Sequence, residues 1–233
     1  MVNHTSENEI KNIIQKKLEK NSFLHTPGMA FSHFAVQSVM FDILESTKLP
    51  IIKSFTDGPR DAGFDGILIT INHIPVTSVS DIPLFLPGIK YKVRFFFIQS
   101  KYKDNFNSND WKAFSSSIIS FFSNQINRDI VNPKVRTFLD ILEALKKKRN
   151  SYNIKFVARV VIVSMPVKLI NPEIENGQLV LENTLINLGV VDSAKFKYYG
   201  ASDLLALYQT RGYLIRQGNA NRKYNSRNYR IVA

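Results

Sequence analysis

The sequence contains no cysteine, which excludes disulfide bonds and every metal centre held by thiolates, such as structural zinc and iron–sulfur sites. This absence fits a reducing compartment, and we expect a cytoplasmic protein. No apolar run is long enough to span a bilayer, and the polar first residues contain no signal-peptide core, so we expect no membrane association. The four histidines are scattered without the spacing of a metal site.

Acidic residues are also scarce. Against 31 Lys and Arg there are 19 Asp and Glu, which gives a formal net charge of +12 at pH 7. An excess of this size favours a polyanionic partner, most often nucleic acid, and the alternative is a merely basic soluble protein.

The C-terminal stretch is where the basic character is strongest. Residues 211–233 contain no acid, and tyrosines alternate with cations there. Because arginine and tyrosine suit phosphate contact and base stacking, we expect this stretch to bind nucleic acid, to act as a disordered tail or linker, or both. The cations that carry this expectation are Arg216, Arg222, Lys223 and Arg227.

Hydrophobic periodicity and turn residues predict an alternation of helices and strands. The predicted helices cover residues 6–20, 29–45, 108–126, 133–149, 183–188 and 202–211, and the predicted strands cover 66–71, 92–99, 156–165 and 195–199. Residues 72–90 contain three prolines and predict an irregular connection. We therefore expect one α/β domain over residues 1–210, with a mixed sheet flanked by helices, followed by a basic tail or linker over 211–233.

Two segments carry polar groups at the ends of apolar strands. Residues 57–66 form a glycine-punctuated turn with three aspartates, and residues 95–102 end an apolar run on Gln99, Ser100 and Lys101. Alternate residues of a strand share a face, so the side chains of Gln99 and Lys101 point the same way, about 7 Å apart. If the two strands pair antiparallel, Asp65 lies next to both. The turn does not match a P-loop, because Phe64 and Asp65 stand where Lys and Ser or Thr are required. It does not match an EF-hand either, because Ala62 and Leu68 replace the required Gly and Glu.

This residue set matches the chemistry of phosphodiester hydrolysis. A carboxylate of Asp65, the side-chain oxygen of Gln99 and the backbone carbonyl of Ser100 can ligate a hard cation such as Mg²⁺. Lys101 can orient or deprotonate a water, or offset charge in the transition state. The structural alternative is that Asp61 and Asp65 only cap a tight turn, with Gln99 and Lys101 as ordinary strand-end residues.

The pattern D-x-G-F-D-G, followed by a strand ending Q-x-K, resembles the restriction-endonuclease-like superfamily of PD-(D/E)xK nucleases in its Mrr-type form. With two preceding helices, T-D-G-x-x-D-x-G-F-D-G and F-I-Q-S-K-Y are similar to the N-terminal nuclease domain of abortive phage infection proteins. The resemblance implies a restriction-endonuclease-like mixed sheet, with Asp65 as metal ligand, Gln99 assisting and Lys101 orienting the attacking water. Gln37 and Asp61 would be supporting residues.

The same resemblance implies a Mg²⁺-dependent DNA endonuclease, with Mn²⁺ as a substitute, that acts against phage by abortive infection or restriction. Its partners would be foreign double-stranded DNA, a second copy of the chain, and a further C-terminal region or second subunit. Arg60 and Lys103 flank the site and are candidates for phosphate contact. Gln99 and Gln37 stand where related nucleases carry carboxylates, so the alternative is an inactive module that binds DNA or a protein. RNA as the substrate is a third hypothesis.

Overall fold

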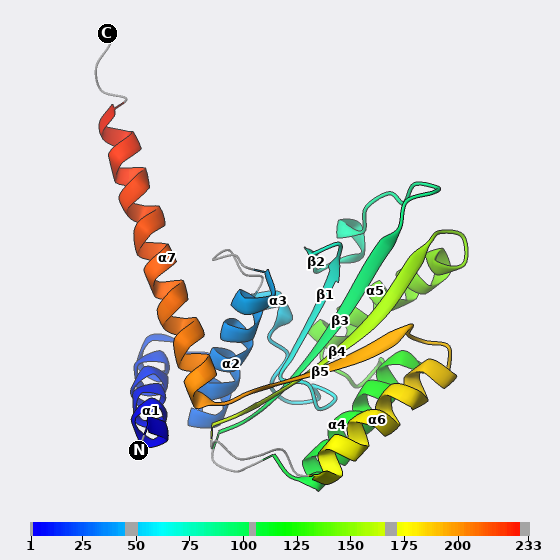
Figure 1. Cartoon of the computed structure of the whole chain (residues 1–233), viewed down its shortest axis with the longest axis horizontal. Coiled ribbons are helices and arrows are strands. Elements are labelled where there is room, and N and C mark those ends of the chain that lie inside the picture. Colours follow the sequence, from blue (N-terminus) through cyan, green and yellow to red (C-terminus); the bar gives the residue numbers. More distant parts are fainter. Residues whose placement is uncertain (1, 45–50, 103–105, 166–171, 229–233) are drawn as a thin grey trace.

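The structure, a computed structural model, describes residues 2–44, 51–102, 106–165 and 172–228. Its centre is one five-stranded sheet with the strand order β2-β1-β3-β4-β5 (Figure 1). The strands are β1 (Gly66–Ile71), β2 (Ile74–Val76), β3 (Tyr91–Lys101), β4 (Ile154–Ser164) and β5 (Ser193–Tyr199). β1 runs antiparallel to β2 and β3, whereas β3, β4 and β5 are parallel, so the predicted α/β class with a mixed sheet is confirmed.

Helices lie on both faces of the sheet. They are α1 (Val2–Lys20), α2 (Pro27–Leu44), α3 (Ile51–Ser54), the 3-10 turn η1 (Val79–Asp81), α4 (Ser108–Phe122), α5 (Pro133–Arg149), α6 (Pro172–Asn187) and α7 (Ala201–Asn228). α4, α5 and α6 cover one face, and α2 lies on the other with α1 and α7 packed around it (Figure 1).

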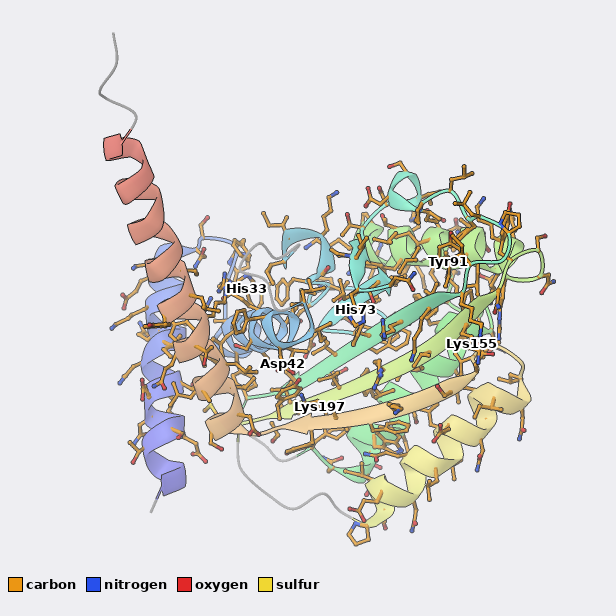
Figure 2. The ribbon with its side chains drawn as sticks, turned by 45° about the horizontal axis from the view of Figure 1, so that its top comes forward. His33, Asp42, His73, Tyr91, Lys155 and Lys197 are labelled. Carbon is orange, nitrogen blue, oxygen red and sulfur yellow. The ribbon has the colours of Figure 1, made fainter. Side chains whose placement is uncertain are left out.

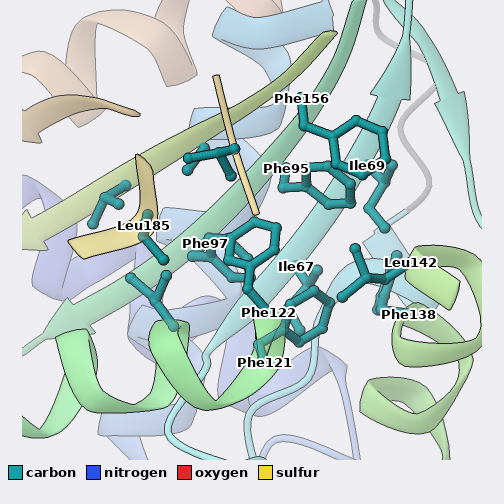
Figure 3. Packing of buried hydrophobic residues seen from close by; sticks show 14 of the residues in the cluster. Ile67, Ile69, Phe95, Phe97, Phe121, Phe122, Phe138, Leu142, Phe156 and Leu185 are labelled. Carbon is teal, nitrogen blue, oxygen red and sulfur yellow. The ribbon is translucent and has the colours of Figure 1, made fainter. Parts of the chain in front are cut away.

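The alternation of side chains in β3 divides the core into two halves. Phe95 and Phe97 point to the face covered by α4 and α5, where they pack edge-on against Phe122 (Figure 3). Phe96 and Ile98 point to the opposite face and contact the cluster that includes α2. β3 is therefore buried on both sides, as expected for the central strand of a sheet covered by helices.

Several element boundaries differ from the sequence-based expectation for identifiable reasons. α1 begins at Val2, so Ser6 lies inside the helix and does not cap it. β2 was predicted as irregular because Pro75 weakens a strand signal, yet an edge strand tolerates proline. α6 begins at Pro172, eleven residues before the predicted start at 183.

The predicted end of the last helix near Arg211 is wrong. α7 continues to Asn228, so residues 211–228 extend this helix (Figure 1). Asparagine and glycine content favoured a tail there, but α7 continues through both Gly212 and Gly218, and no proline interrupts it.

The sequence predicts no membrane-crossing segment, and the helices of the structure bear on that prediction. Within residues 2–44, 51–102, 106–165 and 172–228, no helix combines the length and the hydropathy needed to cross a membrane.

Candidate metal centre

The turn before β1 is folded by its own aspartate. Asp61 accepts hydrogen bonds from the backbone N–H groups of Gly63 at 2.8 Å and Gly58 at 3.3 Å. Gly63, with φ of +80°, supplies a left-handed conformation that the tight turn requires. Arg60 and Ala62 also adopt positive φ. Asp61 therefore has the turn-capping role that the structural alternative assigned to it, and this role aims the turn at the end of β3.

Asp65 joins β1 to the end of β3 and to α2. The antiparallel register pairs Gly66 with Ile98, and the Asp65 N–H donates to the Ile98 carbonyl at 3.0 Å. Asp65 Oδ2 accepts from both the N–H and the hydroxyl of Ser100, each at 2.6 Å. The Ser100 hydroxyl also contacts the Ser32 hydroxyl of α2 at 3.0 Å. The antiparallel pairing that the sequence argument required is thus present.

Three carboxylates converge at this junction. Asp57, Asp61 and Asp65 each offer an oxygen, and these oxygens lie within 4.8 Å of one another. Asp65 is buried, with 6% of its surface exposed, and the other two are half-buried. Oxygen donors at such mutual distances suit a hard cation such as Mg²⁺ or Mn²⁺.

The electrostatics of the three acids favour a cation. Burial raises the pKa of Asp65, the charge of Asp57 adds to this rise, and the hydrogen bonds from Ser100 oppose both effects, which together bring the pKa to about 7. Burial also raises the pKa of Asp57, which a hydrogen bond from Ser32 partly offsets, and burial raises the pKa of Asp61. Desolvated like charges repel one another, and a bound divalent cation would neutralise them.

Lys101 is turned towards α4. Its Nζ lies 2.7 Å from Asp110 Oδ1, and Asp110 closes the capping box of α4 with Asn107. Among the hydrogen bonds and ion pairs of the described residues, none joins Asp65 to Gln99 or to Lys101. Strand alternation places the side chain of Ser100 on the face of Asp65 and those of Gln99 and Lys101 on the opposite face. The backbones of Asp65 and of the end of β3 are therefore adjacent, but the side chains of Gln99 and Lys101 point away from Asp65.

The supporting residue predicted on α2 has a different partner. Gln37 accepts a hydrogen bond from Lys17 Nζ at 3.1 Å, which ties α2 to α1. Burial, with a smaller effect of Arg211, lowers the pKa of Lys17 to about 8. Ser32, five residues before Gln37, is the α2 residue that reaches the carboxylates.

Two functional contacts were missed from the sequence. Ser32 gives no signal, because a serine within an apolar helix looks like any small core residue. Asp110 could have been found, since Asn107 and Asp110 have capping-box spacing and lie just after β3.

The residues predicted to contact phosphate are dispersed. Arg60 is exposed on the turn before β1, beside the carboxylates. Lys103 lies outside the described residues. Arg216, Arg222, Lys223 and Arg227 fall on the helical backbone of α7, in the part for which no side chains are described.

Comparison of the chain with protein-family models, with curated proteins and with solved structures found no match.

Proposed function

We propose that this chain is a metal-dependent nuclease that hydrolyses the phosphodiester backbone of DNA, on a restriction-endonuclease-like fold. The observation that carries the proposal is the convergence of Asp57, Asp61 and Asp65 at the junction of β1 and β3, with oxygens within 4.8 Å of one another. The antiparallel β1–β3 pair followed by the parallel β3–β4 pair supports the fold proposal, because it puts the D-x-G-F-D-G turn beside the Q-x-K strand end.

Each residue has a role in this proposal. Asp65 and Asp57 bind Mg²⁺ or Mn²⁺, Asp61 shapes the turn, and the Ser100 carbonyl assists, whereas Gln99 points away from the carboxylates and takes no part. The cation, when bound, supplies Lewis-acid polarisation of the scissile phosphate. Lys101 breaks its ion pair with Asp110 when substrate binds and then donates a hydrogen bond to the attacking water or to a phosphate oxygen, since its ammonium has three N–H donors. The sequence resemblance leads us to propose foreign double-stranded DNA as substrate, in defence against phage, with a second copy of the chain cutting the other strand.

The test is cleavage of supercoiled and linear DNA in Mg²⁺ and in Mn²⁺. We expect Asp65→Asn and Lys101→Ala each to lower the rate at least a hundredfold, because each removes a group at the reacting phosphate. Asp129→Asn and Lys112→Ala remove the same kinds of charge from exposed positions and should cut at the wild-type rate. Undiminished cleavage by both site variants would refute the assignment.

A second candidate function is a non-catalytic nucleic-acid-binding module on the same fold. The ion pair between Lys101 and Asp110 favours it, because it engages the lysine away from Asp65. Divalent metal affinity separates the two candidates. A rise in melting temperature with Mn²⁺ that is lost in Asp57→Asn supports the nuclease. Salt-sensitive DNA binding with no metal effect and no cleavage supports the module.

A further inference from the structure

One half of a sheet face is left open by the helices. α2 and its neighbours cover the face at Phe96, Ile98 and Val163, near the ends of β3 and β4. Over the starts of these strands, none of the helices that the structure describes lies on that side (Figure 2). We name this uncovered region the basic sheet face after the six cations that it carries, which are Lys92, Arg94, Lys155, Arg159, Lys195 and Lys197.

Strand register brings these cations together from three strands. Lys92 of β3 pairs with Lys155 of β4, and Arg159 of β4 pairs with Lys195 of β5. Residues paired in neighbouring parallel strands share a face and lie about 4.8 Å apart. Figure 2 looks onto this face, with Lys155 towards one end and Lys197 near Asp42 towards the other.

Among the described residues, one acid, Asp42 of α2, makes a hydrogen-bonded contact with a cation of this surface. Asp42 of α2 contacts Lys197 Nζ at 2.7 Å and the Tyr199 hydroxyl at 2.5 Å, at the border with α2. The charge of Arg94, followed by slight burial and the charges of Arg159, Lys195 and Lys155, lowers the pKa of Lys92. Like charges opposite one another destabilise a sheet, so this arrangement costs stability unless an anion offsets it.

A hollow where the basic sheet face meets α2 contains guanidinium donors without acceptors among the described residues. It measures about 240 Å³, and its lining includes Thr70, Arg94, Arg159 and Lys195 of the sheet together with Asp42 of α2, which contacts Lys197. Arg94 Nη1 and Arg159 Nε are shielded from solvent, and neither has a hydrogen-bond partner in the part of the chain that the structure describes. A buried guanidinium donor without an acceptor is unfavourable, and a phosphate oxygen is the acceptor that suits its geometry.

We propose that the basic sheet face binds the phosphate backbone of a nucleic acid, with Arg94 and Arg159 holding one phosphate in the hollow. Lys92, Lys155 and Lys195 then contact the adjacent phosphates. Lys155 and Arg159 are four residues apart, about 13 Å along β4, which matches roughly four nucleotides at 3.4 Å per phosphate along the helix axis. Because cations continue beyond the hollow, a polymer fits this face better than a single small phosphate.

This surface is distinct from the carboxylate cluster. Arg94 and Ser100 are six residues apart on β3, about 20 Å, and α2 lies over the sheet between them. Binding here needs no divalent cation and does not rest on the nuclease proposal. It would hold a nucleic acid whether or not the chain cuts it.

The test is binding of fluorescein-labelled 20-base-pair DNA and RNA duplexes by the full chain in EDTA, over a series of salt concentrations. We expect Arg94→Gln/Arg159→Gln to weaken binding at least tenfold and to reduce the slope of log K against log salt by about 2. The matched control, Arg136→Gln/Lys147→Gln, removes two exposed cations from α5 on the opposite side of the sheet and should bind more tightly than that variant, close to wild type.

A second double variant tests the same surface in case the arginine variant misfolds. Lys92→Gln/Lys155→Gln changes two exposed side chains, so its melting temperature should match that of the wild type while binding still weakens. Wild-type affinity and salt slope in both pairs would overturn the proposal. So would competition by millimolar inorganic phosphate that displaces the duplex completely at constant ionic strength, since that indicates a small-phosphate site. The duplex that binds more tightly, DNA or RNA, is the polymer that this face recognises. Because the assay is done in EDTA, failure of the nuclease proposal would leave these binding results unchanged.

Discussion

Asp65 combines two demands on one side chain. It is buried, and it accepts two short hydrogen bonds from Ser100 that fix the end of β3. Its carboxylate also lies beside two other acids, so its charge is unfavourable in the protein alone. Residues of this kind, costly for stability and held in place by hydrogen bonds, concentrate at functional sites.

The pKa of Asp65 predicts a pH dependence of stability. Its value rises from 3.8 to about 7 on folding, so the folded state binds an extra proton in that interval. Stability therefore decreases as pH rises from about 4 to 7 and stays lower above it. Asp65→Asn removes this loss while its amide oxygen can accept the same bonds from Ser100. We expect the variant to exceed the wild type at pH 8 by at most about 4 kcal/mol, and to differ little at pH 4.

Urea unfolding of both proteins at pH 4 and pH 8 measures this difference. Asp129→Asn, on an exposed loop, is the control and should follow the wild type at both values. A gap between Asp65→Asn and wild type that is the same at the two pH values would contradict the pKa assignment.

At the scale of elements, the site depends on how closely α2 approaches β1. Gly66, the first residue of β1, faces Val36 of α2, and a Cβ at Gly66 would meet Val36 Cγ2 at 2.7 Å. Ser32 lies one turn before Val36 and takes part in the carboxylate network. The glycine therefore sets the distance at which α2 reaches Asp65.

We expect Gly66→Ala to destabilise the fold by about 1–3 kcal/mol, because it pushes α2 from the sheet. Adding Val36→Ala makes room, so the double variant should lose less stability than the sum of the single changes. Gly28→Ala, whose Cβ meets only Thr26 at 3.8 Å, is the control. Urea denaturation measures the free energy of unfolding of the wild type, the two single variants and the double variant. Strict additivity would show that the contact with Val36 does not cause the loss of stability in Gly66→Ala.

Local patterns predicted the elements that enclose the site. β1 and α5 begin and end as predicted, because the apolar run 66–71 marks β1, and Pro133 and the basic run 146–149 mark the two ends of α5. The adjacency of Asp65 and the end of β3 was also predictable, since it follows from antiparallel pairing. The partner of Lys101 was not predicted, because it depends on where α4 begins after the chain leaves the sheet.

The basic sheet face could not be read from the sequence for a related reason. Its cations lie on three strands separated by helices, so each looks like an ordinary exposed residue in its own strand. Only the β3–β4 and β4–β5 registers show that Lys92 faces Lys155 and that Arg159 faces Lys195.

At the scale of the whole molecule, the basic sheet face and the C-terminal part of α7 are two separate stretches rich in Lys and Arg. The C-terminal part of α7 extends away from the sheet (Figure 1). Leu204 and Leu205, at the start of α7, are buried and anchor the helix. A nucleic acid longer than the sheet face could therefore also meet the cations of α7.

We expect the C-terminal cations to add to binding independently of the sheet face. The variant changes Arg216, Arg222, Lys223 and Arg227 to Gln, and its control changes the exposed Lys11, Lys16, Lys112 and Lys147 to Gln. The salt slope for duplex DNA should fall by about 1 for each cation that contacts phosphate, and more in the variant than in the control. Fluorescence anisotropy over a salt series measures it, and equal slopes in the two proteins would exclude a specific role for this part of α7.

The packing of α6 on α4 has an optical consequence. Trp111, the single tryptophan, is 4% exposed, and its indole nitrogen lies 2.1 Å from where a Cβ at Gly177 would stand. Its emission therefore reports on one side of the sheet, where α4 meets α6 and Phe196. Far-ultraviolet circular dichroism reports on all helices, including α1, α2 and α7. If the two signals change at different urea concentrations, the layers on the two faces of the sheet unfold separately, and a single tryptophan suffices to reveal it.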